Sequence, residues 1–151
     1  MNYLKQKADD NKKVAEWCER KCYYDAAVNR LYYFLFQNIK YYIITNNLEN
    51  EYEQFATSEK AKSEYSTHKI TYKFMCTKCE QQLTDFNDIK DLHSLRILIN
   101  QRNCSDYEND VSIVGSVNYE NQFKSKYRLV ENVLKKINIL WGYYEREAIR
   151  N

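Results

Sequence analysis

Residues that break helices are almost missing from this 151-residue chain. It has no proline and only 2 glycines, Gly115 and Gly142, which both lie in the last third. A β-rich domain of this length needs many tight turns, and glycine, proline and Asn-Gly pairs supply most of them. Because these signals are missing, the sequence predicts an all-α fold, with residues 1–151 forming a single domain. The expected architecture is an antiparallel bundle of four or five helices.

Long apolar runs are missing as well. No stretch approaches the roughly 20 residues of a membrane-spanning helix, and the segment from Met1 to Lys13 is polar, unlike a signal peptide. The net charge of +2 is too small to indicate a nucleic-acid partner by itself. The sequence therefore predicts a cytoplasmic protein with no membrane partner. The 5 cysteines, an odd number, are typical of reduced thiols in that compartment.

Apolar spacing predicts where the first two helices lie. A helix from about Asn2 to Cys22 is expected to bury a ragged apolar face. The members of that face are Leu4, Ala8, Val14, Trp17 and Cys18. Asp25 is the expected N-cap of a second helix, from Ala26 to about Asn46. This second helix is apolar nearly all round, so we expect it at the centre of the bundle.

The rest of the chain is predicted to hold two or three more helices. Residues 47–64 show no apolar periodicity, so at most a short helix within a loop is expected there. A third helix is predicted from about Thr67 to Leu83, and a fourth from near Asp88. A loop is expected over 108–118, and a long last helix over 118–148. Its predicted core residues are Phe123, Tyr127, Val130, Leu134, Ile137 and Trp141.

Two groups of polar residues interrupt the apolar pattern. The first lies at spacings of three and four in the second helix and comprises Asn29, Arg30, Tyr33 and Gln37. The second follows the Leu92, Leu95 and Ile99 stripe of the fourth helix and comprises Arg102, Asn103, Asp106 and Tyr107. A guanidinium directed into a bundle needs anionic or hydrogen-bonding partners. Either Arg102 pairs with Asp106 one turn on, or the two groups surround one polar pocket.

These motifs resemble those of the HEPN superfamily, and more closely the small HEPN proteins encoded beside minimal nucleotidyltransferases. In the second helix the pattern AA-x-x-R-x-YY-x-x-F is carried by Ala26, Ala27, Arg30, Tyr32, Tyr33 and Phe36. In the fourth, the pattern R-x-x-[small]-D-Y is carried by Arg102, Ser105, Asp106 and Tyr107. Ser66, His68 and Lys69 are similar to the S-H-K that opens the family's third helix. The resemblance covers roughly Lys12 to Ile139.

The resemblance implies a homodimer that cleaves RNA at the dimer interface without metal or another cofactor. In active members, a 2′-OH attacks the adjacent phosphate while arginines stabilise the charge on the phosphoryl oxygens. The implied catalytic residues here are Arg102, Asn103, Asp106 and Tyr107. The implied RNA-binding or supporting residues are Asn29, Arg30, Tyr33 and Gln37. The implied role is that of a toxin or antiviral defence effector, with a nucleotidyltransferase-type antitoxin or a defence-system protein as partner.

The chain departs from the active pattern at its proton-transfer positions. Tyr107 stands where a histidine follows the motif arginine, and Gln37 stands where relatives often carry histidine. The two histidines, His68 and His93, match no catalytic position. Tyrosine is a poor base at neutral pH, which leaves Asp106 as a candidate. The alternative function is therefore a non-catalytic HEPN scaffold that dimerises and binds nucleotide, RNA or a partner protein.

Two cysteine pairs offer a zinc site as an alternative to core packing. Cys76 and Cys79 form a C-x-x-C, and Cys18 and Cys22 lie four apart in the first helix. Four thiolates can hold zinc tetrahedrally. Both pairs, however, fall inside predicted helices instead of glycine-containing turns, and cysteine is common in helical cores. The sequence therefore favours core cysteines and no metal site.

Overall fold

The computed structural model describes residues 2–62, 67–82, 121, 123–135 and 137–138. These residues form four helices, α1 (Asn2–Arg20), α2 (Tyr24–Thr45), α3 (Glu49–Lys62) and α4 (Thr67–Gln82), and a further one over 123–135 and 137–138 that we call the last helix. Within these ranges there is no strand, which confirms the all-α prediction. None of their helices combines the length and the apolar character needed to cross a bilayer. The predicted fourth helix and the 108–118 loop lie outside the described residues.

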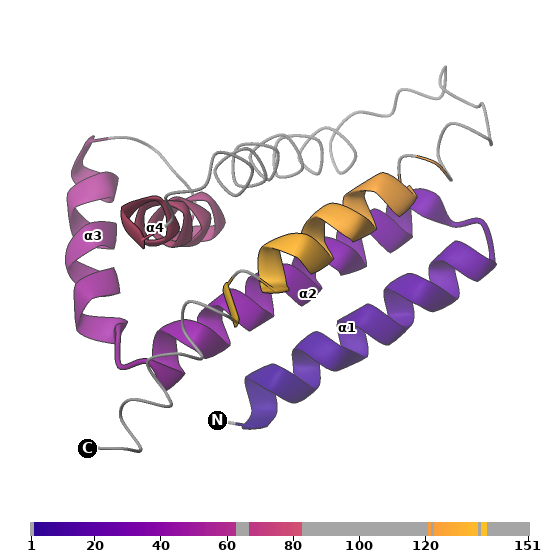
Figure 1. Cartoon of the computed structure of the whole chain (residues 1–151), viewed down its shortest axis with the longest axis horizontal. Coiled ribbons are helices and arrows are strands. Elements are labelled where there is room, and N and C mark those ends of the chain that lie inside the picture. Colours follow the sequence, from indigo (N-terminus) through magenta and orange to yellow (C-terminus); the bar gives the residue numbers. More distant parts are fainter. Residues whose placement is uncertain (1, 63–66, 83–120, 122, 136, 139–151) are drawn as a thin grey trace.

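The helices α1 and α2 form an antiparallel hairpin, and the last helix lies along α2 (Figure 1). α4 is seen nearly end-on in this view, so it crosses the hairpin, and α3 stands beside it. One hydrophobic core joins α1, α2, α4 and the last helix. Its largest fully buried side chains are Tyr32, Tyr72, Phe123, Leu31, Leu35, Ile39, Ile70, Met75 and Ile137.

Small side chains allow α1 to pack closely on α2. Ala8, Ala15 and Cys18 are buried, together with the polar Asn11, at spacings of three and four. The predicted face was partly wrong, because Val14 and Trp17 are exposed. Ala15 and Cys18 occupy the positions next to them in sequence and take up the contact with α2. A stripe of small residues gives a weak apolar signal. The predicted face therefore followed the larger Val14 and Trp17.

The expectation that α2 is central holds. Its buried residues lie on nearly all sides of the helix and are Ala27, Val28, Leu31, Tyr32, Phe34, Leu35, Phe36, Gln37, Asn38, Ile39, Tyr42 and Ile43. The helix begins at Tyr24, with Tyr23 as N-cap and no side-chain cap. Asp25, the predicted cap, lies instead in the first turn. There its carboxylate interacts favourably with the positive end of the helix dipole.

Residues 49–62, expected to hold at most a short helix, form the 14-residue α3. Its contacts with α4 are largely aromatic: Tyr52 and Phe55 both meet the ring of Phe74, with centroid distances of 5.4 and 5.5 Å. The hydroxyls of Tyr52 and Thr71 are 3.0 Å apart, and Lys78 pairs with Glu51. Tertiary contacts of this kind outweigh the missing apolar periodicity.

The last helix agrees with its predicted spacing over the described residues. Its buried residues are Phe123, Val130, Val133, Leu134 and Ile137. Tyr127 is half-buried, and Trp141 lies outside the description. α4 likewise spans Thr67–Gln82, and its predicted end, Leu83, lies outside the described residues.

Candidate functional site

Three of the predicted pocket residues form a polar row on α2. Asn29, Tyr33 and Gln37 lie four residues apart, so they follow one another along one side of the helix. Gln37 is only 8% exposed. The side-chain oxygens Oδ1 of Asn29 and Oε1 of Gln37 are buried, and within the described part of the chain neither accepts a hydrogen bond. A buried acceptor without a donor costs about 1–3 kcal/mol. These two oxygens, like Oδ1 of Asn46 after the end of α2, can accept a hydrogen bond from a bound group.

Polar residues that face α1 contrast with this row. Arg30 is turned toward α1 and donates through Nη1 to Oδ1 of Asn11 at 3.3 Å. The buried Asn38 donates to the Phe34 carbonyl at 2.8 Å and accepts from Nζ of Lys5 at 3.1 Å. These contacts tie the hairpin together. Arg30 was predicted to support the pocket, but the hydrogen bond that it makes within the described residues is to Asn11 of α1.

α4 brings a histidine to the row. The His68 ring stacks on Phe36 with a centroid distance of 4.2 Å and meets Tyr33 edge-on at 6.2 Å. Tyr32 and Tyr72 complete this aromatic cluster, and the Tyr72 hydroxyl donates to the Tyr32 carbonyl at 3.3 Å. His68 is half-buried, so its imidazole lies at the border between the core and the surface.

Sequence reasoning did not assign a site role to His68. The signal that could have found it is its position in the first turn of α4, four residues before the buried Tyr72. That spacing places His68 on the side of α4 that faces α2. The remaining predicted residues, Arg102, Asn103, Asp106 and Tyr107, lie outside the described residues.

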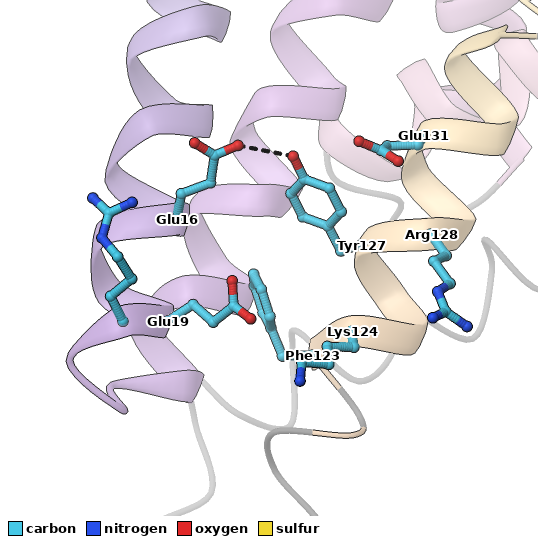
Figure 2. Close-up of a pocket in the computed structure, with 8 residues that line it drawn as sticks. Glu16, Glu19, Phe123, Lys124, Tyr127, Arg128 and Glu131 are labelled. Atoms are coloured by element: carbon cyan, nitrogen blue, oxygen red, sulfur yellow. Dashed lines mark hydrogen bonds between the residues drawn. The ribbon is translucent and has the colours of Figure 1, made fainter.

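A concave feature lies between α1 and the last helix, apart from the polar row. This cleft of about 460 Å³ is lined by Glu16, Glu19, Arg20, Phe123, Lys124, Tyr127, Arg128 and Glu131. In Figure 2 the Tyr127 ring points from the last helix toward α1, where its hydroxyl donates to Oε1 of Glu16 at 2.9 Å. Burial and the carboxylates of Glu16 and Glu131 raise the pKa of Tyr127 above its usual range. The neutral hydroxyl therefore remains a hydrogen-bond donor that joins the two helices.

The cysteines make no metal cluster within the described residues. Cys18, Cys76 and Cys79 are buried and Cys22 is exposed. Burial is the main reason why the pKa of Cys79 is raised to about 12. This thiol is protonated at neutral pH, and its sulfur lies 4.0 Å from that of Met75. Cys79 therefore behaves as a core residue, not as a nucleophile.

Comparison of the chain with protein-family models, with curated proteins and with solved structures finds no match.

Proposed function

We propose that this protein is a metal-independent endoribonuclease of the HEPN type that acts as a toxin or antiviral defence effector. RNA is bound beside the polar row of α2, in a homodimer whose activity is restrained by a partner such as a nucleotidyltransferase-type antitoxin. The motif resemblance of the sequence supports the family. The geometry of α2 supports the position of the site.

The observation that carries the proposal is the pair of buried acceptors, Asn29 Oδ1 and Gln37 Oε1. The third side-chain amide of α2, Asn38, is hydrogen-bonded through both its oxygen and its nitrogen. Folding alone gains nothing from burying these acceptors. RNA offers donors that suit them, because its 2′-hydroxyls and base amino groups both donate hydrogen bonds. A motif arginine can engage the same oxygens in the absence of RNA.

The proposed chemistry is transfer of the phosphoryl group within the RNA strand. The 2′-oxygen attacks the adjacent phosphorus, the bond to the 5′-oxygen of the next nucleotide breaks, and a cyclic phosphate and a 5′-hydroxyl result. The motif assigns to Arg102 the role of stabilising the negative charge that develops on the phosphoryl oxygens. A base removes the 2′ proton, and an acid returns a proton to the leaving oxygen.

His68 joins Asp106 and Tyr107 as a candidate for proton transfer. Imidazole is the side chain most often used for this task near neutral pH, and His68 lies against Tyr33 and Phe36 at the row. If His68 moves the proton, His68→Asn slows cleavage and removes the limb of the pH–rate profile that the imidazole causes.

The second candidate function is a non-catalytic scaffold that binds nucleotide or RNA at the same row. Buried acceptors serve binding as well as catalysis, and Tyr107 in place of the motif histidine favours this reading. Binding without cleavage distinguishes the scaffold from the enzyme.

The test is incubation of the purified protein with total RNA in the presence of EDTA. We expect cleavage by the wild-type protein and none by Arg102→Ala. The control is Arg128→Ala, which removes an exposed arginine on the last helix and leaves cleavage unchanged. Loss of folding in Arg102→Ala, or unaltered cleavage, contradicts the assignment of Arg102. Absence of cleavage together with RNA binding that depends on Arg102 identifies the scaffold.

A further inference from the structure

Large aromatic rings are exposed on α1 and the turn that follows it. Trp17 is 49% exposed and Tyr23 60%, and Tyr3 near the start of α1 is 71% exposed. Exposure of this extent is unusual for tryptophan, which most often packs against the core. Such side chains are frequent at binding surfaces, because a ring adds much contact area for little conformational entropy.

The backbone holds Trp17 and Tyr23 side by side. At the end of α1 the amide of Cys22 donates to the Glu19 carbonyl at 2.9 Å, and the amide of Tyr23 donates to the Cys18 carbonyl at 2.8 Å. Cys22 adopts the left-handed conformation, with φ of 61°, that this helix ending requires. The chain turns back on itself, and the rings of Trp17 and Tyr23 stand 6.3 Å apart with an interplanar angle of 44°.

Cations surround this ring pair. Lys13 lies one turn before Trp17, and Arg20 and Lys21 lie one turn after it, all exposed. Within the described part of the chain, none of the three takes part in an ion pair. Nearer the start of α1, the exposed Asp10 accepts a hydrogen bond from Gln6, and Asp9 pairs with Lys5. Glu16 and Glu19 flank Trp17 in sequence, but they are half-buried and line the cleft toward the last helix together with Arg20. The exposed charges around Trp17 are therefore those of Lys13, Arg20 and Lys21.

We propose that Lys13, Trp17, Arg20, Lys21 and Tyr23, together called the Trp17 platform, bind single-stranded nucleic acid. Bases stack on the two rings and the backbone phosphates contact the three cations, an arrangement that recurs in proteins that bind single strands. That the natural strand is RNA rests on the proposed ribonuclease function. The platform lies on the exposed side of α1, whereas the polar row belongs to α2. It would hold a strand away from the cleavage position.

Other occupants fit the platform less well. A second copy of the chain, docked symmetrically on this face, would bring Lys13, Arg20 and Lys21 against the same cations of its partner. A helix that lies on a membrane buries a broad face of leucine, phenylalanine and tryptophan. Here the only exposed aliphatic residue of that size on α1 is Val14, within the described residues. Flat rings between unpaired cations match bases and phosphates better than either alternative.

The test measures binding of a fluorescently labelled oligothymidylate by anisotropy. This DNA lacks the 2′-OH, so the protein binds it without any cleavage. We expect Trp17→Ala and Tyr23→Ala each to weaken binding by roughly fivefold or more, the loss of one stacked base. Lys13→Gln should reduce the slope of log affinity against log salt by about 0.7, the value for one phosphate contact. Lys135→Gln, an equivalent change on the exposed side of the last helix, leaves the slope unaltered.

Fluorescence shows whether bases reach the ring itself. The chain has 2 tryptophans, and Trp141→Phe leaves Trp17 as the only one. In this background the oligothymidylate and an oligouridylate should quench the emission, whereas inorganic polyphosphate should not. The proposal is overturned if Trp17→Ala binds as tightly as wild type. It is also overturned if anionic phosphatidylserine vesicles shift the emission while oligonucleotides do not, or if Trp17→Ala abolishes a dimer instead of DNA binding.

The two proposals fail separately. Oligothymidylate binding that depends on Trp17, with no RNA cleavage by the wild-type protein, supports the platform and rejects the ribonuclease. The opposite outcome supports the ribonuclease and rejects the platform. RNA cleavage then depends on Arg102, Trp17→Ala leaves its rate and KM unchanged, and oligonucleotides do not quench the emission of Trp17. Circular dichroism of Trp17→Ala should equal that of wild type, because half of this side chain is already in solvent.

Discussion

Replacement of Cys22 by glycine should stabilise the protein. Cys22 has a φ of 61°, and a residue with a Cβ pays about 1–2 kcal/mol for this left-handed conformation. Glycine avoids the clash but loses about 0.4–1 kcal/mol through the greater freedom of the unfolded chain. The side chain of Cys22 is exposed, so no core contact is lost. The expected net gain for Cys22→Gly is about 1 kcal/mol, or about 2–4 °C in Tm for a chain of this size.

The measurement is urea and thermal unfolding of Cys22→Gly beside Cys22→Ala. Alanine removes the thiol but keeps the Cβ, so its stability should remain that of wild type. Asn47 ends α2 in the same conformation, with φ of 55°. Asparagine tolerates this region better than cysteine, so Asn47→Gly should gain less than Cys22→Gly. If Cys22→Gly is no more stable than Cys22→Ala, the left-handed turn is not a source of strain and this reasoning is refuted.

Two further predictions concern ionisable groups in the core and the cleft. Tyr127→Phe should lose about 1 kcal/mol, because it removes the hydroxyl that donates to Glu16. A double-mutant cycle with Glu16→Ala, which removes the acceptor, should show that the two residues are coupled, and a coupling of zero contradicts the contact. Cys79 has a pKa raised from 9.0 to about 12 by burial. Above pH 9 the unfolded thiol therefore releases its proton while the folded thiol keeps it, so the free energy of unfolding should fall as pH rises. This fall should be smaller in Cys79→Ala; an equal fall in both contradicts the role of Cys79.

The sequence was informative about the fold wherever large apolar residues recur at helical spacing. The burial of α2 on nearly all sides was predicted, as were the buried Phe123, Val130, Leu134 and Ile137 of the last helix and the start of α4 at Thr67. α1 and α3 were harder. The core face of α1 consists of alanines, a cysteine and an asparagine, whose apolar signal is weak. The predicted face therefore included the exposed Val14 and Trp17 beside the buried Ala8 and Cys18. α3 depends on aromatic contacts with Phe74, a partner distant in sequence.

The candidate site was predicted in part. Helical spacing grouped Asn29, Tyr33 and Gln37 because the row lies within one helix. His68 comes from α4, and its contact with Phe36 depends on how the two helices cross, which no local pattern records. The sequence did not reveal the partner of Arg30 either. Its Nη1 donates to Oδ1 of Asn11 at 3.3 Å, and Asn11 belongs to the neighbouring helix α1. Contacts between elements required the structure.

The central claim is that the buried acceptor of Gln37 serves RNA and not the fold, and its neighbour Asn38 provides the matched comparison. Gln37→Met keeps the length of the side chain and removes an oxygen that has no donor among the described residues. Asn38→Leu keeps the shape but removes the partner of Lys5. Thermal unfolding and RNA cleavage should be measured on both variants and on wild type.

The expected result is a Tm for Gln37→Met at or above that of wild type, with RNA cleavage and binding lost. Asn38→Leu should be destabilised by about 1–3 kcal/mol, because the hydrogen bonds of a buried amide are removed. The contrary result is a Gln37→Met variant that unfolds as readily as Asn38→Leu, or that processes RNA as well as wild type. Either outcome shows that the amide of Gln37 belongs to the fold and that the site lies elsewhere.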